Sequence, residues 1–190
     1  MSKTIKLTNG LRKLKMADYT TGGTIGAVYE VADLTAMSSE TAESETSIAA
    51  GNAVIYSLRS TGKTTGTVSF YGMDDETEAK LFDVRKGKNG GKIYGLKANK
   101  GYKVLIIEGT AVNPATGIEE DTHIIFPKVS LGMIGDEGTT KDADGNETIP
   151  VKSLSFTALA LNNAFQTYKY INSGETPSTI TLDMFNEAEE

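Results

Sequence analysis

The single histidine, His123, is the residue whose type best suits catalysis or metal binding. His123 is the only histidine and cysteine is absent, so a His-based metal site or a Ser/His/Asp triad would have to depend on this single imidazole. It lies in residues 121–131, where polar and apolar residues alternate as in a strand. A lone histidine in such a strand is typical of an ordinary face residue, so the pattern does not favour catalysis or metal binding at His123.

Two short motifs resemble ligand-binding loops but lack essential parts. Gly62-Lys63-Thr64 resembles the end of a phosphate-binding loop, yet position 57 is Ser where that motif needs glycine, and a strand rather than a helix is predicted to follow. Residues 142–147 have the composition of a calcium loop, but glycine comes fourth instead of sixth. Asp-Gly turn chemistry at a hairpin tip explains this segment better.

The acidic residues leave one catalytic class open. Paired carboxylates for glycoside hydrolysis are possible because the acids are many and scattered. Trp is absent and aromatic residues make up only 7% of the chain, so a sugar-binding cleft is poorly supplied.

The net charge of −6 disfavours nucleic-acid binding through phosphates, which needs clustered Lys and Arg. We therefore predict a protein that is not an enzyme and uses no cofactor or metal.

Length and composition favour a single domain. A chain of 190 residues can form one domain with a core, and an apolar content of 38% with many Thr, Ser and Gly residues fits strands with polar outer faces. No apolar run approaches the ~20 residues of a membrane span. Residues 1–10 lack the apolar core of a signal peptide. We expect a protein made in the cytoplasm, with no membrane partner.

A strand, a helix and a second strand must follow one another in the middle of the chain. In residues 64–72, Val and Phe alternate with polar residues, which indicates a half-buried strand. Asp75 and Glu78 have the spacing of a capping box, and a helix over residues 75–84 would have one apolar side before a run of Lys and Gly stops it. Residues 102–109 contain a Val-Leu-Ile-Ile run that suits a strand buried on both faces.

Other strands are predicted on both sides of this block, at residues 11–17, 25–35, 52–58, 121–131, 149–161 and 165–171. Turns are predicted at residues 9–10 and 113–117. Pro127 lacks an amide donor, so it should lie at an edge, at a bulge or at the end of its strand. The chain thus combines seven or eight strands with one helix, and the tail after residue 177 could form a short helix or extend freely.

An acidic segment separates two of these strands. Residues 37–47 contain three glutamates and almost no apolar side chain. Such a segment buries too little surface to offset an ordering cost of ~1–2 kcal/mol per residue. The pattern predicts a long loop, either simply solvated or ordered only against a partner.

The order and spacing of these segments resemble phage major tail proteins, also called tail tube proteins, of the phi13-like group. The resemblance covers most of the chain up to about residue 165 and is carried by residues 9–17, 23–29, 53–58, 66–72, 74–84, 101–108, 124–128 and 151–158. It rests on order and spacing rather than on a diagnostic motif. The helix departs from the family by ending in Asp83-Val84-Arg85-Lys86, where related proteins often have a Leu-Gly turn.

The resemblance implies a mainly β (α+β) tail-tube fold: a β-sandwich or partial barrel of two crossed sheets with one flanking α-helix. Residues 1–172 would form this domain and residues 173–190 a C-terminal extension. Family subunits form rings, generally hexameric, that stack into a tube. The implied partners are copies of the chain, the tape-measure protein and tail-end proteins, while DNA passes through the channel without specific binding. The implied location is the virion tail, after assembly in the host cytoplasm.

Within this interpretation, residues 37–50 become an assembly arm between stacked rings. The residues predicted to act there are Ser38, Glu40, Glu43, Glu45 and Ile48. We expect this segment to be mobile in the monomer and to order on assembly, and we expect some acids to face the channel, where they would repel DNA. The alternative from another class is a β-sandwich binding or adhesin module, which would remain a monomer. A contractile-tail or bacteriocin tube subunit is not distinguished by the sequence.

Overall fold

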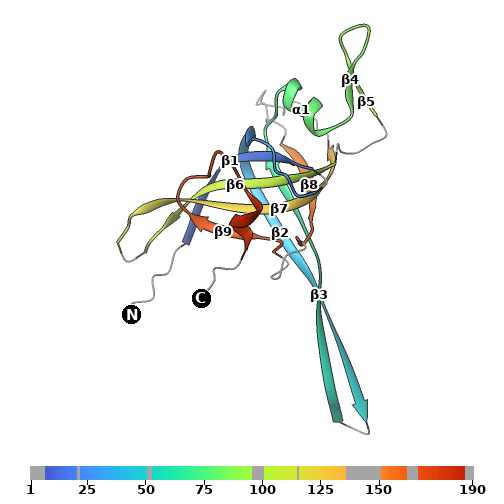
Figure 1. The fold of residues 1–190 in the computed structure, drawn as a ribbon, viewed down its shortest axis with the longest axis vertical. Helices are drawn as coiled ribbons and strands as arrows, with labels where there is room; N and C mark the ends of the chain where they lie inside the picture. Colours follow the sequence, from blue (N-terminus) through green and yellow to red (C-terminus); the bar gives the residue numbers. More distant parts are fainter. Residues whose placement is uncertain are drawn as a thin grey trace, which may run out of the picture.

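In the computed structural model most of the chain is β-strand (Figure 1). The structure describes residues 7–20, 22–50, 53–95, 101–114, 116–135, 151–161 and 167–186. The strands in these residues are β1 Leu7–Tyr19, β2 Tyr29–Ala50, β3 Ala53–Phe70, β4 Val84–Lys86, β5 Lys92–Tyr94, β6 Tyr102–Val112, β7 Glu119–Gly135, β8 Lys152–Ala158 and β9 Tyr170–Ser173. The helical elements are α1 Asp75–Leu81 and the 3-10 helix η1 Leu182–Phe185.

Six antiparallel strands close into a barrel. Their order is β6-β1-β2-β3-β8-β7, and β7 pairs back with β6, so each of these strands has a neighbour on both sides somewhere along its length. β9 adds a short strand to β7, and β4 and β5 form a separate two-stranded sheet. The prediction of a mainly β protein with one α-helix is confirmed. Closure of the sheet through the β6–β7 pairing removes the free edges that an open sheet would leave.

The inside of the barrel is the main hydrophobic core. Val68 and Phe70 of β3 are buried there, as the alternation in the sequence predicted. β8 contributes Leu154 and Phe156, and the ring of Phe156 packs 5.0 Å from that of Phe126, centroid to centroid. The alternating strand predicted over residues 149–161 is confirmed over residues 152–158, while residues 149 and 150 lie outside the described residues.

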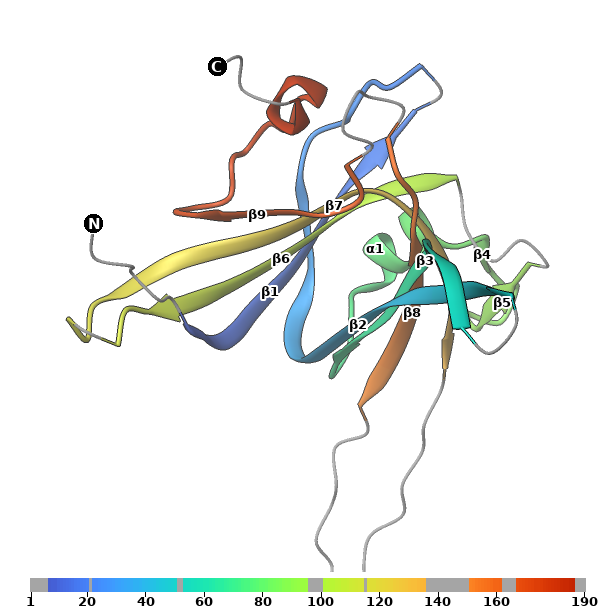
Figure 2. The same cartoon turned by 90° about the horizontal axis from the view of Figure 1, so that it is seen from below.

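A second, smaller core lies on the outer side of β6 and β7. The Val-Leu-Ile-Ile run of β6 is buried on both faces, as predicted, because Leu105 and Ile107 point into the barrel while Val104 and Ile106 point outward. The C-terminal segment, residues 167–186, covers this outer face (Figure 2). Its Ile180 and Phe185 are buried, so this part of the predicted C-terminal extension packs on the barrel; residues 187–190 lie outside the described residues.

The helix is shorter than predicted and is capped one residue earlier. The carboxylate of Asp74, not of Asp75, accepts hydrogen bonds from the amides of Glu76 and Thr77, at 3.0 and 2.9 Å. α1 ends at Leu81 rather than at residue 84. The following residues pair as the β4–β5 hairpin, with Gly90 at a positive φ of 84°, so the Lys- and Gly-rich segment forms a hairpin tip instead of a helix stop.

Two irregular positions in the strands follow from backbone chemistry. Pro127 lies where the β6–β7 register shifts, in agreement with the predicted bulge. The predicted turn at residues 9–10 is wrong: Gly10 lies within β1, beside a register shift, with a φ of 104°. The predicted turn at residues 113–117 is confirmed by hydrogen bonds from the amides of Thr116 and Gly117 to the carbonyl of Asn113.

Candidate assembly site

The segment predicted as an acidic loop is a strand. Residues 37–50 belong to β2 and pair with β3 along their length, from Met37 opposite Val68 to Ala50 opposite Ala53. β8 follows β3 only from Thr64 onward, and β1 follows β2 only as far as Asp33. Beyond the barrel the two strands therefore continue as a two-stranded ribbon, which we call the arm (residues 42–50 and 53–63; Figure 1).

Backbone pairing explains why this polar segment is ordered without a core. Every residue added to an antiparallel ribbon satisfies backbone donors and acceptors across the pair. The side chains add cross-strand contacts: Thr41 and Thr64 hydroxyls lie 2.8 Å apart at the base of the arm, and the Ser57 hydroxyl donates to Glu45. Hydrophobic burial alone therefore underestimates the order of this segment, because pairing across the ribbon adds to it.

The five residues predicted to act in assembly do not form one patch. Ser38 and Glu40 lie at the base of the arm, opposite Thr67 and Thr65. Side chains alternate along a strand, so Glu43 and Glu45 point to the other face of β2. All three glutamates are exposed. Ile48 lies near the tip, with its backbone opposite Tyr56. The structure thus places Ser38 and Glu40 at the base of the arm, apart from Glu43 and Glu45 farther along it.

Both long sides of the arm are open in the part of the chain that the structure describes. Among the described residues, β2 has β3 as its only partner from Leu34 to Ala50, and β3 has β2 as its only partner over residues 53–63. Unpaired backbone groups along such edges are ready to pair with another strand. An isolated two-stranded ribbon is also only marginally stable in water. The arm is therefore the part of the described structure that would gain most from a partner.

A groove with short polar walls lies at the base of the arm. Strands β2, β3, β7 and β8 line it with residues that include Ser38, Glu40, Thr65, Thr67, Ser155 and Thr157. These are the outward-facing residues of strands whose other face fills the barrel. Short hydroxyl side chains make this face smooth and hydrogen-bonding, and another polypeptide could approach its backbone closely.

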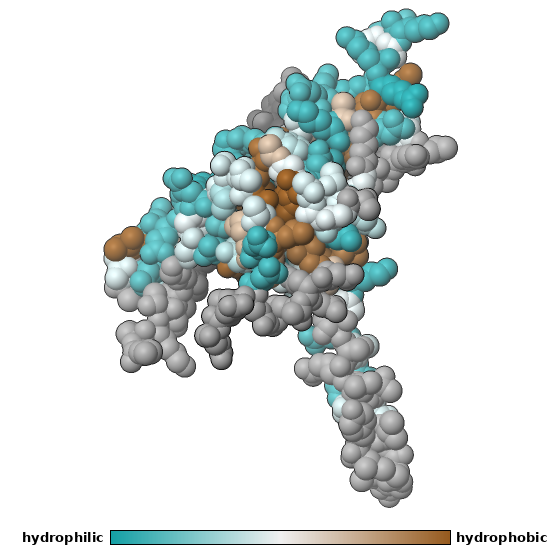
Figure 3. Space-filling model, viewed as in Figure 1, coloured by the Kyte–Doolittle hydropathy of each residue, from teal (hydrophilic) through white to brown (hydrophobic). Residues whose placement is uncertain are grey.

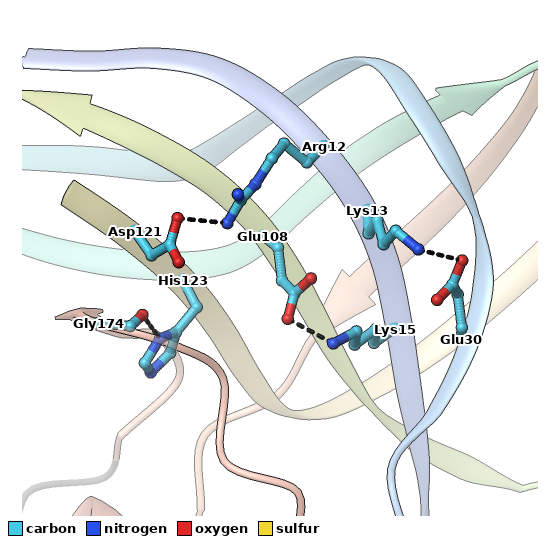
Figure 4. Close-up of polar contacts among 8 residues, drawn as sticks. All are labelled: Arg12, Lys13, Lys15, Glu30, Glu108, Asp121, His123 and Gly174. Atoms are coloured by element: carbon cyan, nitrogen blue, oxygen red, sulfur yellow. Dashed lines mark hydrogen bonds and ion pairs between the residues drawn. The ribbon is translucent and has the colours of Figure 1, made fainter. Parts of the chain in front are cut away.

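Ion pairs occupy the outer face of β1, β2, β6 and β7 (Figure 4). The cations of Arg12, Lys13 and Lys15 lie 2.6 to 2.7 Å from carboxylates of Asp121, Glu30 and Glu108, respectively. Burial raises the pKa of Glu108, but the hydrogen bond from Lys15 and the nearby positive charges of Lys15 and Arg12 act against it, and that pKa lies below its ordinary value. Because each of these cations has a carboxylate partner, the cluster serves to join strands and offers little free charge to a ligand.

His123 lies beside this cluster and holds the C-terminal segment. Its side chain is buried, and Nδ1 lies 3.0 Å from the carbonyl oxygen of Gly174 (Figure 4). A carbonyl oxygen only accepts, so Nδ1 carries the proton. Nε2 has no hydrogen-bond partner among the described residues. The predicted face residue is thus covered by the chain's own C-terminal segment, and its observed contact is a structural one.

The remaining motifs do not form ligand sites in the described structure. Residues 62–64 lie within β3, where a strand continues as predicted, without the helix that a phosphate loop requires. Residues 142–147 lie outside the described residues. No group of three or more potential metal-ligating side chains occurs in the part of the chain that the structure describes. Nor does that part contain a helix long and apolar enough to cross a membrane.

Comparison with protein-family models and with curated proteins gives no match for this sequence.

Proposed function

We propose that this chain is a structural subunit of a phage tail tube. In this proposal the barrel has the tail-tube fold, copies of the chain form rings, and the rings stack around a channel through which DNA passes without specific binding. The tape-measure protein and tail-end proteins are the proposed further partners, and the virion tail is the proposed location. The family resemblance described above is the source of these details.

One observation carries the proposal: a closed barrel bears a long arm whose two edges pair with no other strand among the residues that the structure describes. A domain that needed only to fold would have no use for two strands that extend past all their neighbours. Proteins usually shorten or cover such edges to prevent association, so a long open pair favours association as the function. Repeated contacts between different surfaces of identical subunits build rings and filaments.

The sharpest test of this proposal removes the arm. Removing residues 38–50 alone would leave β3 without its partner, so both strands of the arm must be removed. Thr41 and Thr64 are register partners, and replacing residues 42–63 with Asn-Gly would join them by a two-residue hairpin turn. We expect wild-type protein to form hollow tubes or rings in negative-stain electron microscopy. We expect the shortened variant to keep a β-rich circular dichroism spectrum and cooperative thermal unfolding but to sediment as a small species.

Two results would contradict the proposal. Wild-type protein that stays a monodisperse monomer at high concentration would favour a binding or adhesin module instead. Normal tubes from the shortened variant would show that the arm is not the assembly element.

A further inference from the structure

The hairpin formed by β4 and β5 projects from the barrel at the end opposite to the arm (Figure 1). We call residues 84–94 the basic hairpin, because they contain Arg85, Lys86, Lys88 and Lys92 and no acidic residue. Its surface is mostly hydrophilic with a few apolar atoms among the polar ones (Figure 3). The acids of α1 and the bases of this hairpin are therefore segregated along the chain.

One face of the basic hairpin is already occupied by α1. The Glu78 carboxylate, which is buried, accepts hydrogen bonds from Lys92 Nζ at 2.5 Å and from the Tyr94 hydroxyl at 2.6 Å. Lys92 Nζ also lies 2.7 Å from Asp75. These contacts fix the hairpin on the helix, so it is a supported projection rather than a free loop.

The other face has no such partner in the described structure. Arg85 and Ile93 are register partners, so they share the face opposite to that of Lys92 and Tyr94. Ile93 is 59% exposed, and the Arg85 side chain is 79% exposed and lies 3.6 Å from the carboxylate of Asp83. Lys88 lies at the exposed tip. A cationic rim beside an exposed apolar side chain fits an extended, acidic segment that also carries apolar residues.

The arm has this composition. Glu43 and Glu45 share one face of β2 and are exposed. The sequence toward the tip holds Ile48, Val54 and Ile55. We propose that the basic hairpin is the docking surface for the arm of a second copy of this chain. This inference rests on the proposed function and names the receiving surface that the assembly would use.

The placement of the two surfaces makes the contact self-propagating. The arm and the basic hairpin lie at opposite ends of the long axis, so a copy that binds by its arm still offers its own hairpin to the next (Figure 1). Such a heterologous, head-to-tail contact extends without limit along an axis. Nucleic acid is the weaker candidate for this surface, because phosphate binding needs more clustered cations than this hairpin holds and the whole chain carries a charge of −6.

Charge reversal tests the contact in both directions. An arm variant, E43K/E45K, and a hairpin variant, R85E/K88E, should each raise the protein concentration needed for tube formation at least about tenfold, which corresponds to roughly 1.4 kcal/mol per contact. A mixture of the two variants should form tubes again, because each reversed surface then meets an opposite charge on the other variant. Added salt should weaken assembly of the wild type and of the mixture alike.

The control is E119K/E175K, which reverses two exposed acids outside both surfaces and should assemble as wild type. Circular dichroism and thermal unfolding of every variant separate loss of assembly from loss of folding. If the wild type forms no rings or tubes, the proposed function fails. If the wild type forms them and both reversed variants do so equally well, or the mixture is not restored, the docking surface is wrong while the proposed function stands.

Discussion

Strands β2 and β3 run through both the barrel and the arm, but their surroundings differ between the two regions. Within the barrel, β3 has β2 on one side and β8 on the other, and its Val68 and Phe70 are fully buried. In the arm, β2 is the only described partner of β3, and no arm residue whose side chain the structure describes belongs to a hydrophobic core. Stability therefore comes from the barrel, while the arm adds surface and open edges at little cost to folding. The β2–β3 hairpin can thus be anchored in the barrel core by one half and contact a partner with the other half.

The largest predicted effect is a loss of unfolding free energy when the core of the barrel is disrupted. Phe156→Ala removes a buried ring that packs on Phe126, and a Phe-to-Ala change in a core costs about 3–5 kcal/mol of unfolding free energy. Glu43→Ala on the arm should change that free energy by less than about 0.5 kcal/mol. Urea denaturation of both variants measures the difference. Similar losses from the two changes would mean that the arm shares in the stability of the barrel.

Two glycines of β3, one in the barrel and one in the arm, compare how tightly the two regions are packed. A Cβ on Gly66 would lie 2.5 Å from both the Ser38 carbonyl oxygen and the Phe156 ring, so Gly66→Ala should cost about 2–3 kcal/mol. Gly62→Ala, in the arm, meets the Ala42 carbonyl oxygen at 3.2 Å and should cost less, because a ribbon with open sides can shift. Thermal unfolding of the pair measures this contrast. An equal cost at both positions would show that the arm is as tightly packed as its base.

The same contrast explains what the sequence could predict. The barrel strands have a hydrophobic period, so Val68, Phe70, Leu154 and Phe156 could be assigned to an inner face from their spacing alone. The arm has no such period: Glu43 and Glu45 are held by pairing with Thr61 and Arg59 across the turn, and a run of Ser, Thr and Glu gives no local sign of that pairing. The arm and the basic hairpin carry the surfaces proposed for assembly, and no periodic rule assigns them.

The basic hairpin depends on a buried acid, which gives the next prediction. Burial raises the pKa of Glu78, but hydrogen bonds from Lys92 and Tyr94 outweigh it and lower that pKa below its ordinary value of 4.5. Glu78→Gln should cost about 1–2 kcal/mol, discounted because Lys92 is 36% exposed. Glu76→Gln, whose exposed carboxylate pairs with Lys80, is the matched control and should have little effect.

The lowered pKa fixes the sign of the pH dependence. A group whose pKa is lower in the folded state stabilises the fold above its unfolded pKa and loses that contribution as pH falls through the folded value. The unfolding free energy of the wild type should therefore fall more steeply below pH 4.5 than that of Glu78→Gln. Denaturant titrations between neutral pH and pH 3 measure it. Parallel pH profiles for the two proteins would show that Glu78 does not carry this linkage.

The smallest predicted effect concerns the start of α1, the helix that supports the basic hairpin. The Thr77 hydroxyl donates to Asp74 at 2.6 Å and the amides of Glu76 and Thr77 add two further bonds, which together hold the pKa of Asp74 below its ordinary value. Asp74→Ala should therefore loosen the first turn, whereas Asp75→Ala removes only an exposed contact with Lys92. Hydrogen exchange at the amides of the first turn would separate them. Faster exchange in Asp74→Ala alone places the cap at Asp74. Faster exchange in Asp75→Ala alone would restore the capping box that the sequence pattern predicts, and the hairpin would then depend on Asp75 twice, through the helix start and through Lys92.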